Sequence, residues 1–366
     1  MGESLKKSLL RTSSMHLCVV AVFASLVPLT SCQPSSEDET HSRSTTTPTL
    51  YYFTWSDYAD DELLRGFEQQ AGVELVVDTF SSNEELLAKL QGGAGGYDVA
   101  VPSDFMVTVM AREGFLADLD LGMIPNAARL VERMQHLPFD PSNRHSVPYL
   151  WGTVGIAYDS DVVSPAPDSW EILWDPRYKG RISMLNDQRE VFGVALRMMG
   201  HSLNATNPNV IEQAKLKLLA QKPLVKIYTS ENYDNLLSSG DVVLAHGWGG
   251  AVARAMDERP SLRYVIPKEG GTIWADCLVV LKSSRNKDLA MRFINYLLDA
   301  DVAVGTTNRL RFASAIDDVK RRVDPAVREN PAVYPPDDAF DRLEWMVDVG
   351  EAIRLYDRAW TELKVR

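Results

Sequence analysis

Tryptophan and a carboxylic acid recur two residues apart at two places in the chain. Trp55 is followed by Asp57, and Trp274 is followed by Asp276. In a β-strand, residues i and i+2 project from the same face, so each pair offers an aromatic surface beside an anion. An alkyl ammonium suits such a surface, because the face of an indole attracts a cation and a carboxylate accepts its N–H donors. The alternative for either pair alone is that the indole fills a core while the acid faces water.

Charge and composition restrict the other chemistry open to this chain. The 366 residues include 38 Lys and Arg against 50 Asp and Glu, a formal net charge of −12, and this excess of acid disfavours nucleic acid as a partner. Six scattered histidines without a Cys/His cluster give no metal-site spacing, so we expect no metal and no cofactor. The glycine cluster at 92–96 precedes a predicted strand, whereas phosphate-binding loops follow one, and we interpret it as a helix stop.

The N-terminal segment has the pattern of a secretory signal. Basic residues lead into an apolar run, Leu17–Leu29, that is too short to span a bilayer as a helix. The run ends at Leu-Thr-Ser-Cys32, which resembles the lipobox of bacterial lipoproteins, where cleavage before the cysteine is followed by its lipidation. We therefore expect a signal peptide over 1–31, a lipid on Cys32 and a flexible polar tether over 32–49. The alternative is that Cys32 is an ordinary residue after conventional cleavage.

Processing at this site changes both the charge and the cysteine count. Cleavage before Cys32 leaves 35 basic and 49 acidic residues, a formal charge of −14. Cys18 leaves with the signal peptide and Cys32 carries the lipid, so Cys277 has no cysteine left to form an internal disulfide.

The body of the chain alternates strands with helices, which is typical of an α/β domain with a largely parallel sheet. In its first part we predict strands at Leu50–Phe53, Val73–Phe80 and Tyr97–Val101, and helices at Asp61–Ala71 and Asn83–Leu90, the latter with a Ser82/Glu85 capping box. Further on we predict strands at Thr153–Ala157, Val242–Ala245 and Leu278–Leu281, and helices near Val191–Met199, Leu289–Leu298 and Trp345–Leu363.

Five motifs in order resemble the polyamine-binding proteins of bacterial ABC importers, which bind spermidine and putrescine. They are Thr54–Tyr58 (TWSDY), Tyr97–Ser103 (YDVAVPS), Asp187–Phe192 (DQREVF), His246–Trp248 (HGW) and Glu269–Asp276 (EGGTIWAD). The resemblance runs from about Leu50 to the C-terminus, and several ordered motifs are far more specific than any one of them.

The resemblance implies an α/β, two-lobed periplasmic binding protein-like fold of type II, with two α/β lobes joined by a multi-strand hinge. We expect one lobe to comprise residues 50–155 and 276–315, and the other residues 156–275 and 316–366. The ligand would lie between the lobes, which would close on it by hinge motion. The implied function is extracytoplasmic capture of putrescine or spermidine, or both, by a membrane-anchored monomer that delivers them to an ABC permease, with no catalytic step.

Carried onto this sequence, the family's binding residues form an aromatic box, a set of acids and a set of polar contacts. They are Trp55, Tyr58, Trp248 and Trp274 for the box; Phe105 and Phe312 where relatives often have Tyr; Asp57, Asp187, Glu190 and Asp276 for the amines; and Ser56, Ser103 and Ser230 for polar contacts. Ser103 could instead be a helix N-cap, and Asp187 and Glu190 could belong to a solvated turn.

Two departures leave the preferred polyamine open. Met346 stands where spermidine binders tend to have Gln, and Ala251 stands where putrescine-selective members tend to have Asp. The Ser56-Asp57 pair leans towards the putrescine type.

Two other functions stay open from the sequence. An extracytoplasmic hydrolase could use paired acids such as Asp187 and Glu190, although the chain has neither G-x-S-x-G nor a zinc signature. A binding protein for a different small cationic solute would use the same fold and the same acids.

Overall fold

The computed structural model describes residues 47–59, 61–93 and 95–365. The predicted signal peptide, Cys32 and all but the last three residues of the predicted tether lie outside this range. Among the described residues, Cys277 is a free, buried cysteine. No helix in this part of the chain is both long and apolar enough to cross a bilayer.

The strands are β1 (Thr49–Trp55), β2 (Glu74–Phe80), β3 (Val99–Ala100), β4 (Ser146–Asp159), β5 (Ile182–Met184), β6 (Val225–Tyr228), β7 (Leu244–Trp248), β8 (Leu262–Val265), β9 (Gly271–Val280), β10 (Ala313–Ser314) and β11 (Leu343–Trp345). The α-helices are α1 (Asp61–Ala71), α2 (Asn83–Gln91), α3 (Asp104–Arg112), α4 (Gln188–Met198), α5 (Pro208–Gln221), α6 (Tyr233–Ser238), α7 (Gly249–Glu258), α8 (Lys287–Leu297), α9 (Ala300–Leu310), α10 (Val319–Arg322), α11 (Pro325–Arg328) and α12 (Ile353–Val365). The 3-10 helices are Ser56–Tyr58, Leu121–Met123, Pro125–Arg129, Glu132–Met134, Trp170–Trp174, Pro176–Tyr178, Lys222–Leu224, Asp337–Arg342 and Gly350–Ala352.

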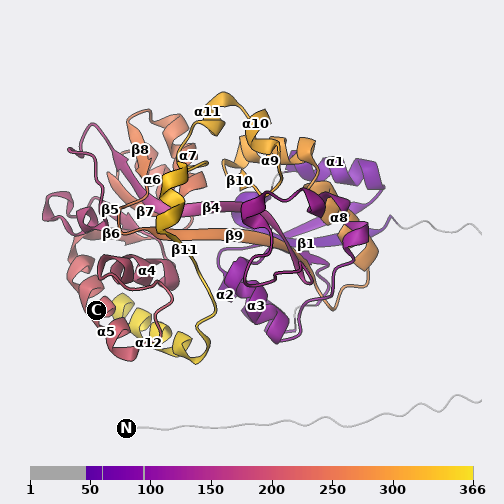
Figure 1. Ribbon diagram of the computed structural model, residues 1–366, viewed down its shortest axis with the longest axis horizontal. Coiled ribbons are helices and arrows are strands. Elements are labelled where there is room, and N and C mark those ends of the chain that lie inside the picture. The colour runs from indigo at the N-terminus through magenta and orange to yellow at the C-terminus, as the bar shows by residue number, and fades with distance from the viewer. Residues whose placement is uncertain (1–46, 60, 94, 366) are drawn as a thin grey trace, which may run out of the picture. The chain divides into compact units, whose positions relative to one another are not determined.

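Two long strands connect the two ends of the molecule. The strand order is β2-β1-β3-β9-β4-β7-β5-β6, with β8 and β10 beside β4 and β11 beside β9. Figure 1 shows β4 and β9 running side by side through the middle, with β1–β3 at one end and β5–β8 at the other. We call the part built on β1–β3 the first lobe and the part built on β5–β8 the second lobe. The residue boundaries predicted for the lobes stay a prediction.

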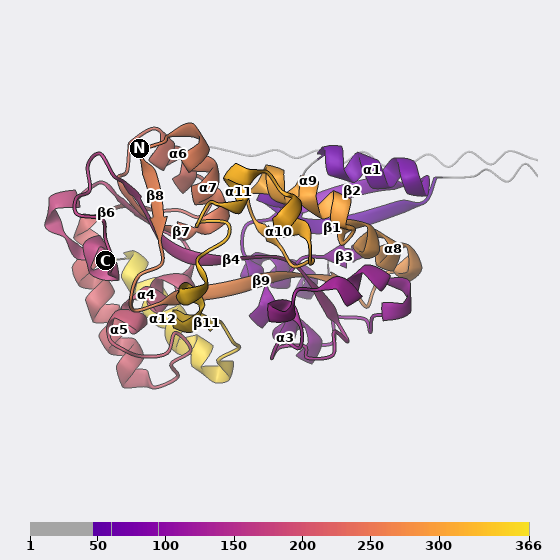
Figure 2. The same cartoon turned by 45° about the horizontal axis from the view of Figure 1, so that its top comes forward.

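Helices cover the strands of both lobes. In the second lobe, α6 and α7 lie on one side of the strands, and α4, α5 and α12 lie on the other (Figure 1, Figure 2). All residues of β4 and β9 are buried, as expected for strands covered on both faces. A polar side chain on these strands is therefore removed from water and needs a partner, and Asp276 and Thr272 of β9 are two such residues.

Most predicted elements are present, and the C-terminal one is partly wrong. The helix predicted from Trp345 begins only at Ile353, because residues 343–345 form β11 and pair in parallel with residues 271–273 of β9. Glu344 of β11 accepts hydrogen bonds from Arg197 and Asn204, which holds this segment extended. The strand predicted at 278–281 is the end of the longer β9, and β3 is shorter than predicted because only residues 99 and 100 pair with neighbours.

The capping box predicted at the start of α2 forms in part. Ser82 is the N-cap, and its hydroxyl accepts from the N–H of Glu85 at 3.1 Å. The Glu85 carboxylate accepts from the N–H of Ser81 at 2.8 Å, one residue before the N-cap that a capping box would use. The cap fixes Asn83, the first residue of α2, beside the start of α3.

Candidate functional site

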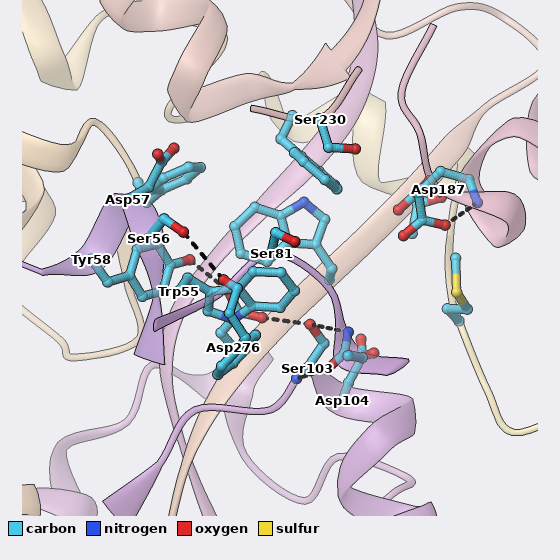
Figure 3. A pocket seen from close by; sticks show the side chains of 18 of the residues that line it. Trp55, Ser56, Asp57, Tyr58, Ser81, Ser103, Asp104, Asp187, Ser230 and Asp276 are labelled. Atoms are coloured by element: carbon cyan, nitrogen blue, oxygen red, sulfur yellow. Dashed lines mark hydrogen bonds between the residues drawn. The ribbon is translucent and has the colours of Figure 1, made fainter. Parts of the chain in front are cut away.

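A cavity of about 270 Å³ lies between the two lobes. Its walls come from the turn after β1 and the starts of α2 and α3 in the first lobe, from the start of α4 and the loop before α6 in the second, and from the shared strand β9. Figure 3 shows side chains from these segments around one space. All thirteen predicted binding residues line it, namely Trp55, Ser56, Asp57, Tyr58, Ser103, Phe105, Asp187, Glu190, Ser230, Trp248, Trp274, Asp276 and Phe312.

Seven more residues line the cavity, and six of them carry no signal that the sequence argument used. They are Phe80, Ser81, Asn83, Asp104, Glu231 and Thr272; the seventh is Met346, one of the two departures from the family pattern. Ala251, the other departure, is buried on α7 and does not line the cavity.

Aromatic rings form the apolar walls. Phe312 meets Tyr58 and Trp274 edge to face, with ring centroids 5.5 Å apart in both pairs. The ring of Trp55 packs against the ring of Phe80, with centroids 4.7 Å apart. These contacts fix the orientation of the rings, so a ligand meets preformed faces instead of ordering mobile side chains.

The carboxylate of Asp276 is held at the centre of the cavity by two hydroxyl groups. Tyr58 donates to Oδ2 at 2.5 Å and Ser103 donates to Oδ1 at 2.7 Å. Asp276 is only 5% exposed, and burial raises its pKa to about 6 although both hydrogen bonds favour the charged form. A buried carboxylate without a cationic partner is costly, and an incoming ammonium would remove that cost.

Ser103 is expected from the sequence to be either a polar contact in the binding site or a helix N-cap, and it has features of both. It is the N-cap residue of α3 by position, but its side chain makes no capping hydrogen bond. Its hydroxyl instead donates to Asp276, while Asn83 donates to that hydroxyl at 3.1 Å and accepts from the Ser103 N–H at 3.0 Å. Asn83 therefore orients Ser103, and Ser103 in turn orients the carboxylate of Asp276.

Asp187 and Glu190 are not in a solvated turn, so that alternative is wrong. Asp187 is the N-cap of α4 and accepts from the N–H of Glu190 at 3.0 Å. Glu190 is 5% exposed and accepts from the hydroxyl of Thr272 at 2.7 Å. Burial raises the pKa of both carboxyls, and the neighbouring Asp187 raises that of Glu190 further.

Asp104 is a cavity acid that the sequence argument missed. It begins α3, is 1% exposed, and one carboxylate oxygen accepts from the N–H of Phe105 at 2.7 Å. The other oxygen, Oδ2, has no hydrogen-bond partner among the described residues. Burial, together with the charge of Asp276, raises the pKa of Asp104 to about 8. An acid directly after the Pro102-Ser103 motif was the available signal.

One of the two tryptophan–acid pairs shares a strand face, as predicted, and the other does not. Trp274 and Asp276 both lie on β9 and both line the cavity. β1 ends at Trp55, and Asp57 lies in the following 3-10 turn, where its carboxylate accepts from Arg254 at 2.6 Å. Asp57 reaches the cavity because the chain turns there and not because of strand periodicity.

Gly152 of β4 makes room for the indole of Trp274. A Cβ at this position would lie 2.6 Å from the ring, which is buried and must shift to make room for it. We expect Gly152→Ala to lower the free energy of unfolding by about 1–3 kcal/mol, as overpacking does, measured by urea denaturation. Gly193→Ala in α4 is the control, because its Cβ would meet nothing closer than 3.6 Å. Equal stability of the two variants would show that the indole can move.

The charged side chains that line the cavity share one sign. The charged residues that line it are all acids, which are Asp57, Asp104, Asp187, Glu190, Glu231 and Asp276. No Lys or Arg appears in this lining, so the site is unsuited to an anion. In the described part of the chain, no group of three or more His, Cys, Asp or Glu side chains is placed to hold a metal ion. The arrangement suits an organic cation with an apolar body.

Comparisons with known proteins place this chain among solute-binding proteins. The family model for bacterial extracellular solute-binding proteins matches residues 96–342. The spermidine/putrescine-binding periplasmic protein 1 of Haemophilus influenzae is 35% identical over 341 residues, covering 92% of this chain and 95% of that protein.

Two solved structures share the fold. The spermidine/putrescine ABC transporter substrate-binding protein PotD of Streptococcus pneumoniae has a TM-score of 0.77 at 30% identity and covers 87% of this chain and 99% of its own. The TpPotD lipoprotein of Treponema pallidum has a TM-score of 0.79 at 32% identity and covers 87% of this chain and all of its own, 100%. These likenesses confirm the predicted α/β periplasmic binding protein fold.

Proposed function

The chain belongs to the family of bacterial extracellular solute-binding proteins, and we propose that it is the polyamine-binding protein of an ABC import system. The observation that supports the ligand class is the cavity itself, in which buried carboxylates and aromatic faces meet. Among the described residues, no Lys or Arg lines its wall. Such a lining satisfies both parts of a polyamine, because carboxylates accept from its ammonium groups and rings cover its methylene chain. Proteins of this family bind solutes without chemical conversion, so the chain is not an enzyme and the hydrolase alternative is wrong.

We propose that the thirteen predicted residues form the binding surface, with Asp104 as an addition. Asp276 would accept from one ammonium group, and Asp187 and Glu190 from another. Trp274, Trp55 and Tyr58 would cover the methylene chain between them. The ligand would then touch both lobes and the shared strand β9, so binding would favour a closed arrangement of the lobes.

The protein acts outside the cytoplasm, and we propose in addition that a lipid on Cys32 anchors it to a membrane. Support for the anchor comes from the Leu-Thr-Ser-Cys32 sequence and from the likeness to the Treponema pallidum lipoprotein. We further propose that the closed, liganded form is the one that the ABC permease recognises. Incorporation of labelled fatty acid by the wild-type chain, and its loss in Cys32→Ala, would support the anchor; a wild-type chain that incorporates no fatty acid would contradict it.

Calorimetric titration of the chain from residue 33 onwards with putrescine, spermidine and cadaverine tests the ligand class. We expect putrescine or spermidine, or both, to saturate a single site with a one-to-one stoichiometry. Glutamate, citrate and glucose serve as controls, because the acidic lining offers no partner for an anion and no ion pair for a neutral sugar. Absence of binding by every polyamine would overturn the proposal.

A further inference from the structure

Arg254 holds a cation against Asp57, an acid at one end of the cavity, although Arg254 is not itself among the described residues that line the cavity. It lies on α7 of the second lobe, and its guanidinium donates to Asp57 Oδ2 at 2.6 Å and to the carbonyl of Leu310 at 3.0 Å. A second carboxylate, that of Asp234, lies 3.5 Å away, and the guanidinium carbon is 5.7 Å from the ring centre of Phe312. Four contacts on different elements hold the guanidinium in place, unlike a single exposed ion pair.

The acids of the cavity stand at three places along it. Asp57 lies on one side and Asp187 on the other, with Asp276 between them (Figure 3). Their elements give the same order, since Asp57 follows β1 of the first lobe, Asp276 is on the shared β9, and Asp187 begins α4 of the second lobe. Three places for carboxylates would match a ligand with three nitrogens, provided that all three are free to accept.

The ion pair with Arg254 makes the carboxylate of Asp57 unavailable to a ligand ammonium. The carboxylate of Asp57 is already paired, and a ligand ammonium there would meet the guanidinium as well as the acid. The remaining acids are Asp276 and Asp104 in the middle and the Asp187/Glu190 pair at the far end. Glu231 also lines the cavity, but it follows Ser230 in the loop before α6 of the second lobe, so it does not take the place of Asp57 in the first lobe.

We infer that Arg254 is a specificity-determining residue that makes this cavity select a diamine over a triamine, by pairing with the carboxylate that a third ammonium group would need. This inference rests on the proposed polyamine function and adds the ligand's length and charge to it. The ion pair between Arg254 and Asp57 also connects the two lobes, because Asp57 follows β1 of the first lobe and Arg254 lies on α7 of the second.

The test compares the affinities of putrescine and spermidine for the wild-type chain and for Arg254→Gln, by competition titration at about pH 8 and physiological ionic strength. For the wild type we expect putrescine to bind at least about tenfold more tightly than spermidine, because a third ammonium at this end would meet a carboxylate that is already paired with a guanidinium. In Arg254→Gln the ratio should shift by about tenfold or more towards spermidine, because Asp57 is then free to accept. Arg254→Lys keeps a cation at this place and should keep most of the wild-type preference.

Arg322→Gln is the matched control, since it also removes one arginine from an ion pair, with Asp301, and neither residue lines the cavity. Its putrescine-to-spermidine ratio should equal that of the wild type. A wild-type protein that binds spermidine as tightly as putrescine would overturn the inference even if a variant fails to fold. An unchanged ratio in a folded Arg254→Gln protein would also overturn it. Both results leave the polyamine function standing, whereas failure of the wild type to bind any polyamine removes the function and this inference together.

Discussion

Asp276→Asn is expected to weaken polyamine binding by roughly two to four decades, since breaking a buried ion pair costs about 3–5 kcal/mol. Asp276 is the acid on the strand that both lobes share, and it is 5% exposed. The amide keeps the size of the side chain and can still accept from Ser103 or Tyr58, so the change removes the charge and little else. Calorimetry or competition titration with putrescine measures the loss.

The stability of the same variant separates binding from folding. Burial raises the pKa of Asp276, so its charge is unfavourable in the empty cavity, and Asp276→Asn should unfold at the wild-type temperature or above it. Asp140→Asn is the matched control. Asp140 is also buried, but it accepts from the N–H groups of Arg144, His145 and Ser146 and does not line the cavity.

The Asp140→Asn control should lose stability and keep its affinity for polyamine. Asp140→Asn should lower the unfolding temperature and leave the affinity of the folded protein unchanged, because the amide puts an N–H donor where a carboxylate accepted from the backbone. An Asp276→Asn protein that binds putrescine as the wild type does would contradict the central role of this acid.

The acids and aromatic rings of the cavity could be predicted because they lie in short motifs that keep their order along the chain. Trp274 and Asp276 illustrate this, since strand periodicity alone puts them on one face of β9. The lobe helices could be predicted for the same reason, because α1 and α2 each have a local apolar pattern and α2 has an N-cap.

The features that the sequence did not disclose all depend on partners far away in the chain. Arg254 meets Asp57 across 197 positions, and a single arginine on an amphipathic helix gives no signal of such a contact. Asp104 is an unusual acid only because Asp276 and the second lobe enclose it. The helical pattern predicted from Trp345 does not show that Trp345 pairs with β9 as the last residue of β11, and this pairing overrides the local preference.

The affinity for polyamine is expected to rise steeply with pH and to level off above about pH 8. A bound cation favours the charged form of each carboxyl, so binding lowers pKa values that burial had raised to about 6 for Asp276 and about 8 for Asp104. The ligand stays charged over this range, since an alkyl ammonium such as that of lysine titrates near about 10.4. One released proton gives about tenfold in affinity per pH unit, so Asp104 alone gives roughly a hundredfold between pH 6 and pH 8. Glu190, whose pKa burial also raises to about 8, adds to this rise.

Titration in two buffers of different ionisation enthalpy would detect the released protons directly, and Asp104→Asn would identify one source. This variant should release fewer protons at pH 7 and should show a shallower rise of affinity with pH.

The free energy of unfolding of the ligand-free protein should fall as the pH rises, whereas the affinity for polyamine increases. A raised pKa contributes stability that is fully present below the usual value of 3.8 and is lost as the pH rises to about 8. The advantage in unfolding temperature of Asp104→Asn over the wild type should therefore grow from pH 4 to pH 8, and a constant difference, or an affinity independent of pH, would show that these carboxyls are already charged in the empty cavity.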